Sequence, residues 1–177
     1  MQLQEPRRTF LGEIPPGEPG TRATLRAMQQ LVEHYKRDDT IRSAALDLVR
    51  GLPPKAYGRE VRTVFEFVRD GIRYVRDIYG VETLQTPLVT LDVGQGDCDD
   101  KATLLASMLE SIGHPTRFIA VGFTSPDAFS HVYVETKVGP NWLPLDATVE
   151  TARVGWRPPR PALASMVVHN GGARVSR

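Results

Sequence analysis

The sequence predicts an α+β fold, with a helical N-terminal half followed by an antiparallel sheet. Apolar residues recur at helical spacing in several segments up to residue 113. Three short apolar runs, separated by turn residues, follow that point and have the length and composition of strands. Helices and strands segregated in this way are typical of α+β domains, and 177 residues suit one such domain.

Four helices are expected. The first begins at Thr21, and the second follows the polar residues 37–39. The third carries the clearest amphipathic stripe and ends near Gly71, and the fourth begins beside Cys98 and ends at Gly113. The apolar positions that define them are Leu25, Met28, Val32 and Tyr35; Ile41, Ala45, Leu48 and Val49; Val61, Val64, Phe65, Val68 and Ile72; and Ala102, Leu105, Met108, Leu109 and Ile112.

Three strands are expected at residues 118–123, 132–138 and 142–145. Gly139-Pro140 supplies the turn chemistry between the last two, and the fourth helix is expected to pack on the resulting sheet. Residues 77–95 show little periodicity, so a loop or short extended pieces are expected there. Function often lies on such loops.

Proline and glycine gather at both ends of the chain. Residues 1–20 are therefore expected to form an extended arm, and residues 157–177 an extended tail of low order. Residues 21–156 remain as a single domain.

Composition excludes several function classes. The chain has 22 Lys and Arg against 21 Asp and Glu, a formal net charge of +1, so neither nucleic acid nor an anionic membrane surface is expected as a partner. Its apolar stretches fall short of the ~20 residues of a spanning helix, and no secretory signal is visible. Cys98 is the single cysteine, which excludes an intrachain disulfide and favours a reducing, cytoplasmic location.

Cys98 is expected at the N-terminus of the fourth helix. Unpaired backbone N–H groups and the helix dipole favour a thiolate there and can hold a developing oxyanion, as acyl transfer on a cysteine requires. The carboxylates of Asp97, Asp99 and Asp100 would raise the thiol pKa if they faced the sulfur, or they could cap the helix instead. The competing interpretation is a small buried apolar residue.

A base and its orienting carboxylate can be placed on the last two predicted strands. Alternation puts Val132 on the core face and His131 on the other face. A two-residue hairpin loop at 138–139 would pair His131 directly with Asp146, and one at 139–140 would make them diagonal neighbours. They share a face in both registers, so Cys98, His131 and Asp146 have the order and logic of a papain-like triad.

The residues around these positions form three motifs. They are Gly96-Asp97-Cys98-Asp99-Asp100-Lys101-Ala102, Ser130-His131-Val132-Tyr133-Val134-Glu135 and Trp142-Leu143-Pro144-Leu145-Asp146-Ala147-Thr148. Together they resemble the transglutaminase-like superfamily, with the closest resemblance to its small bacterial and phage branch. The resemblance implies a cysteine-protease-like fold in which Cys98 is the nucleophile, His131 the base and Asp146 its orienter. The chain has no room for the β-domains and calcium sites of the large animal transglutaminases, so neither calcium dependence nor protein cross-linking is implied.

Other side chains are weaker candidates. Gln85 and Gln95 are best placed in the sequence to supply a second oxyanion donor. Trp142 could shield the imidazole or fill the core, and core is the more frequent use of a strand tryptophan. His114 follows a helix end and suits the role of base less well than His131. The acidic residues lack the spacing of a calcium loop, so no metal and no cofactor is expected.

These features predict a thiol acyl-transfer enzyme that acts on peptide or isopeptide amides: a cysteine peptidase or amidase, or a transglutaminase-like acyltransferase. Hydrolysis and transamidation both stay open, because water access depends on the shape of loops. The alternative is a non-catalytic structural or assembly protein, such as a phage or prophage virion component, that retains the fold and contacts partners through its terminal arms.

Overall fold

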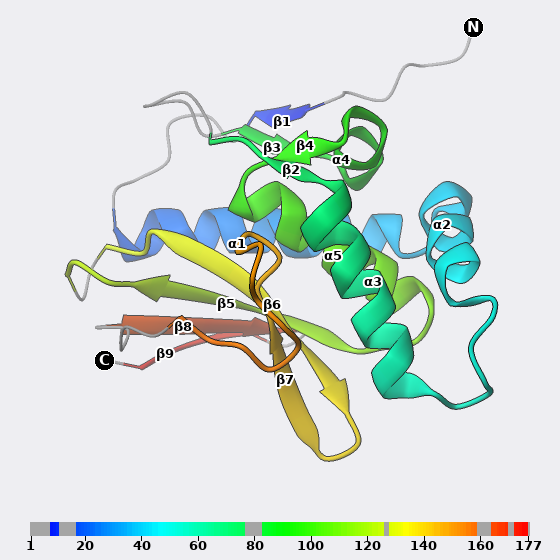
Figure 1. Cartoon of the computed structure of the whole chain (residues 1–177). Helices are drawn as coiled ribbons and strands as arrows, with labels where there is room; N and C mark the ends of the chain where they lie inside the picture. The colour runs from blue at the N-terminus through cyan, green and yellow to red at the C-terminus, as the bar shows by residue number, and fades with distance from the viewer. Residues whose placement is uncertain are drawn as a thin grey trace, which may run out of the picture.

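The computed structural model describes residues 8–10, 17–76, 83–125, 128–158, 164–169 and 172–176. It confirms the α+β class: a helical N-terminal part precedes a sheet of antiparallel strands (Figure 1). Among the described residues, none of the helices combines the length and the apolarity that crossing a bilayer requires.

Four of the helices match the predicted ones. They are α1 (Glu18–Tyr35), α2 (Asp39–Val49), α3 (Tyr57–Gly71) and α5 (Cys98–Ser111). Helix α1 begins three residues before the predicted Thr21, because Pro19 lies in its first turn, where proline is tolerated.

Helix α4 (Pro87–Val93) was not predicted, since residues 77–95 were expected to lack regular structure. The Oγ1 atom of Thr86 caps its start by accepting a hydrogen bond from the Val89 N–H, and Gly94 ends it with a left-handed φ of 67°. Its seven residues are too few for a periodic pattern to stand out.

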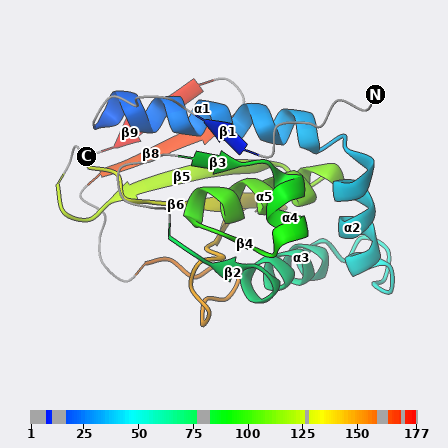
Figure 2. The ribbon, with the colours of Figure 1, turned by 90° about the horizontal axis from the view of Figure 1, so that it is seen from above.

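The main sheet has five strands in the order β7-β6-β5-β8-β9, and every neighbouring pair is antiparallel. The first three are β5 (Thr116–Gly122), β6 (His131–Val138) and β7 (Asn141–Leu145), close to the predicted positions. Helix α5 is central: it contacts β5, β6 and each of the other four helices described (Figure 2).

Two strands correct the expectation of a low-order tail. β8 (Ala164–His169) and β9 (Gly172–Ser176) extend the sheet beyond β5. Nearby prolines masked a short alternating pattern whose apolar positions, Met166 and Val168, are buried in the core. The predicted N-terminal arm lies mostly outside the described residues, as do parts of the tail.

The segments just before and just after α4 each form a small strand pair with another part of the chain. β1 (Arg8–Phe10) pairs antiparallel with β3 (Thr83–Gln85). β2 (Arg73–Tyr74) pairs in parallel with β4 (Gln95–Gly96), so the end of α3 lies beside the start of α5.

The helices pack on one face of the sheet. Val132, Phe118, Met166 and their neighbours on this face share one apolar core with the helices, which confirms the predicted core face of β6. The opposite face carries a smaller apolar cluster that contains Tyr133.

The β6–β7 hairpin turns at Gly139-Pro140, since Val138 is paired with Asn141. This is the second of the two registers considered for the hairpin. It makes His131 and Asp146 diagonal neighbours on one face, because Val134 is paired with Leu145.

Candidate active site

Cys98 is the first residue of α5, as predicted. Asp97 caps the helix: its side chain accepts hydrogen bonds from the backbone N–H groups of Asp99 (2.9 Å) and Asp100 (3.1 Å). The side chain of Asp100 accepts in return from the Asp97 N–H, which completes a capping box. Local sequence therefore places the sulfur at a helix start through a well-defined cap.

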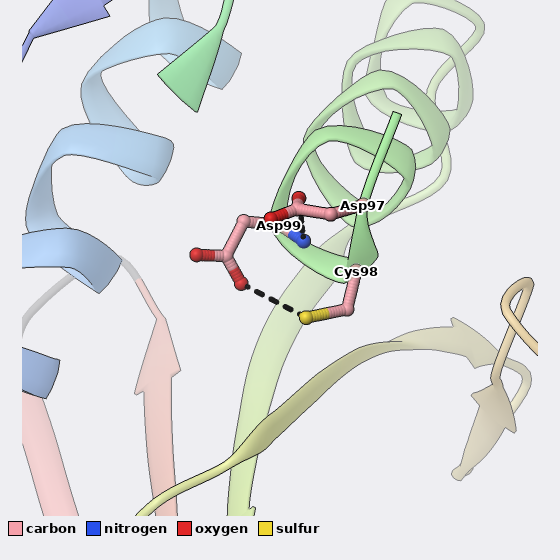
Figure 3. Close-up of side chains that lie close together, drawn as sticks. All are labelled: Asp97, Cys98 and Asp99. Atoms are coloured by element: carbon pink, nitrogen blue, oxygen red, sulfur yellow. Dashed lines mark hydrogen bonds between the residues drawn. The ribbon is translucent and has the colours of Figure 1, made fainter. Parts of the chain in front are cut away.

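The sulfur itself faces a carboxylate. The Cys98 thiol donates to Asp99 Oδ1 at 3.4 Å (Figure 3), and the backbone N–H of Val132 is directed to the sulfur. Burial, then the charges of Asp99 and Asp97, raise the pKa of Cys98 far above its ordinary value, and the Val132 N–H only partly opposes them. Two directions were open from the sequence: the helix start favours a lowered pKa, and carboxylates that face the sulfur favour a raised one. The structure shows the raised pKa, with burial as the larger cause and the two carboxylates after it.

His131 and Asp146 are joined directly. His131 Nε2 lies 2.7 Å from Asp146 Oδ2, and the carboxylate is fully buried while the imidazole is partly exposed. Asp146 Oδ1 also accepts from the N–H and the hydroxyl of Thr148, at 3.1 and 2.6 Å. Burial acts to raise the pKa of Asp146, but the hydrogen bonds from His131 and Thr148 outweigh it and hold that pKa below its ordinary value.

The Cys98 sulfur lies against strand β6, which also carries His131. The sulfur receives the N–H of Val132, the residue after His131 on the same strand. Because Nε2 is bonded to Asp146, Nδ1 is the ring nitrogen that this carboxylate does not occupy. Within the described part of the chain, the thiol hydrogen is directed to Asp99 and not to the ring.

Gln85 is held in a buried network. Its backbone N–H and its side-chain amide both donate to the Asp100 carboxylate, at 2.7 and 2.8 Å, and Oε1 has no hydrogen-bond partner. The Gln85 amide therefore braces the first turn of α5. Gln95 lies on β4 and accepts a hydrogen bond from Arg73 at 2.6 Å.

Trp142 lies at the other end of the hairpin from His131. It is paired with Lys137 on β6, and the Arg117 guanidinium stacks over its ring at 4.3 Å. The structure therefore does not bring Trp142 to the imidazole.

One residue of the Cys98 motif was overlooked. Lys101 is 2% exposed, although lysine is rarely buried. A signal was available, since residues 101, 105, 108 and 112 fall at helical spacing and thus on the buried face of α5.

The atoms that could hold a metal ion in the described part of the chain belong to Asp97, Cys98 and Asp99, which lie within 4.8 Å of one another. Both carboxylates already accept hydrogen bonds from the protein. We assign no ion to this group.

A helix that begins at a cysteine and packs on an antiparallel sheet, with a His–Asp pair on that sheet, has the architecture of the cysteine-protease-like folds. The family model of the transglutaminase-like superfamily matches residues 42–147, more than half of the chain, and the chain belongs to that superfamily. No curated protein sequence matches it.

Solved structures agree on the fold. A candidate protease from Parabacteroides distasonis has a TM-score of 0.60 at 18% identity, over 83% of this chain and 29% of its own. A candidate cysteine protease from Cytophaga hutchinsonii has a TM-score of 0.53 at 16% identity, over 85% and 53%. Calcium-bound LapG of Legionella pneumophila has a TM-score of 0.57 at 20% identity, over 84% and 86%. The chain thus spans less than a third of the first protein and about half of the second.

Proposed function

We propose that this protein is a cysteine peptidase or a related thiol acyltransferase that acts on peptide or isopeptide amides. The observation that carries the proposal is the His131–Asp146 hydrogen bond, formed on the strand whose next residue contacts the Cys98 sulfur. The protease-like fold of the matching structures is consistent with a protein or peptide substrate.

In this proposal Cys98 begins the reaction as a neutral thiol. His131 Nδ1 accepts the thiol proton as the sulfur attacks the amide carbonyl, and the Asp146 carboxylate stabilises the imidazolium that results. His131 then gives the proton to the departing amine as the C–N bond breaks, which leaves a thioester on Cys98. Water or a second amine attacks the thioester and restores the thiol.

The oxyanion would be held at the start of α5. The N–H groups of Asp99 and Asp100 are already bonded to the Asp97 cap. No hydrogen bond in the described part of the chain uses the N–H of Cys98, so we assign this group as the backbone oxyanion donor. The Gln85 side-chain amide already donates to Asp100, so it would stabilise the first turn of α5 and would not bind the oxyanion.

The test compares wild type with Cys98→Ala on a diverse peptide mixture analysed by mass, with and without a primary amine. Chain cleavage identifies a peptidase, water in place of ammonia identifies an amidase, and amine incorporation identifies a transglutaminase. Each sample is run with added calcium and with EGTA, since LapG structures exist in calcium-bound and EGTA-treated forms.

A non-catalytic assembly protein is the second candidate. The observation that favours it is the thiol bonded to Asp99, since a buried neutral thiol is a poor nucleophile. Identical masses for wild type and Cys98→Ala in all samples would favour this role and overturn the enzyme.

A further inference from the structure

Lys101 is a buried cation that the proposed reaction does not use. Its side chain leaves α5 three residues after Cys98 and ends inside the core. Nζ donates to the carbonyl oxygens of Arg69 (3.2 Å) and Ile72 (2.5 Å) at the end of α3. These carbonyls are among those that a helix end leaves unpaired, so the ammonium caps α3 from a neighbouring helix.

The charges of acidic groups on three segments act on this cation. Asp70 lies on α3, Asp146 follows β7, and Glu150 lies on the segment after it; all three charges favour the protonated amine. Burial is the stronger influence and lowers the pKa of Lys101 to about 8. The amine therefore carries a charge at neutral pH and loses most of it by pH 10.

We propose that Lys101 is a positioning residue of the candidate active site, which holds the end of α3 against α5 and supports the ionised Asp146 from within the core. This inference rests on the proposed function, because it assigns Lys101 to the same site.

Lys101 is linked to one side of that site by hydrogen bonds and to the other by charge. On the cysteine side, Ile72 leads directly into β2, and β2 pairs with β4, the strand that ends just before the Asp97 cap. On the histidine side, the carboxylate of Asp146 favours the protonated Lys101 through its charge, and Asp146 is the hydrogen-bond partner of His131. A single buried charge thus acts on the segment before the nucleophile and on the carboxylate behind the base.

The test is a double-mutant cycle of Lys101→Gln and Asp146→Asn, measured as urea unfolding midpoints at pH 6.5 and pH 10. Glutamine is neutral and its side chain is one bond shorter, so the variant loses the charge and weakens the cap; the weakened cap is common to the single and the double variant and cancels in the cycle. At pH 6.5 we expect the double variant to lose less than the sum of the two single losses. At pH 10 we expect the losses to add, because Lys101 is then mostly neutral in the wild type.

Lys137→Met, on the exposed end of β6, is the matched control. The change that it causes in the unfolding midpoint should add to that of Asp146→Asn at both pH values. Additive losses for Lys101→Gln at pH 6.5, or the same coupling at both pH values, would overturn the inference. The cycle measures stability and needs no turnover. If the coupling is observed but wild type gives the same products as Cys98→Ala on every peptide, only the proposed function is overturned. With an active enzyme, Lys101→Gln should lower kcat on the order of tenfold to a hundredfold and leave KM unchanged.

Discussion

The thiol of Cys98 donates a hydrogen bond to the carboxylate of its own neighbour, Asp99, at 3.4 Å. Two features of the helix start therefore act on the same sulfur in opposite directions. The N–H groups and dipole favour the thiolate, whereas burial and the adjacent charges favour the thiol, and the pKa of Cys98 is raised. Cys98 is therefore held as a neutral thiol.

Asp99→Asn should make Cys98 more reactive. Removing the charge lowers the thiol pKa, and each unit of that change gives about tenfold more thiolate at a fixed pH below the pKa. We expect faster alkylation by iodoacetamide between pH 7 and 9, measured by mass. Asp92→Asn, an exposed position on α4, is the control. Equal rates in wild type and Asp99→Asn would show that the Asp99 charge does not set the reactivity.

Asp146→Asn should lower turnover strongly and leave the fold intact. An amide favours the wrong imidazole tautomer and does not stabilise the imidazolium, a loss on the order of 10⁴ for a carboxylate in this role. The Asn oxygen can still accept from Thr148. Peptide turnover and circular dichroism, with the exposed Asp47→Asn as control, check this; unchanged turnover would remove Asp146 from the mechanism.

Asp146 should also contribute to the acid dependence of stability. Its pKa in the folded protein lies below the ordinary 3.8, so its contribution is complete above that value and is lost as the pH falls through the folded pKa. Urea midpoints between pH 6 and 2 should decline less steeply for Asp146→Asn than for wild type. Parallel curves would contradict the assigned direction.

Gly96→Ala should disturb the start of α5. An added Cβ would lie 2.6 Å from the Asp100 Cβ and 3.0 Å from Oδ2, so the capping box must shift. We expect a loss of about 1–3 kcal/mol in the free energy of unfolding. Gly58→Ala is the matched control: its Cβ meets nothing within 4 Å on helix α3, and it should stabilise by roughly 0.5–1 kcal/mol. Equal effects would refute the steric argument.

Much of the fold was predictable because it depends on residues close together in the chain. Helical spacing located α1, α2, α3 and α5, and Gly96-Asp97-Cys98 placed the thiol at a helix start. Strand parity put His131 and Asp146 on one face in either register, and the observed turn at Gly139-Pro140 brings them together.

The remaining features depend on which distant segments meet. β8 pairs with the edge of β5 and buries Met166 in the core, and β9 pairs with β8. The short alternating pattern of β8 does not show that this edge is available to it. Lys101 was recognisable as a residue of a buried face, but its partners at the end of α3 were not.

The protonation state of Cys98 also depends partly on neighbouring residues and partly on the packed chain. The sequence by itself determined that Cys98 begins a helix among three acidic residues, since caps and helix starts are set by neighbouring residues. Only the tertiary structure decided which carboxylate faces the sulfur and how deeply the sulfur is buried. Burial is a property of the packed chain, and it outweighs the local dipole because desolvation acts on the whole charge of the thiolate.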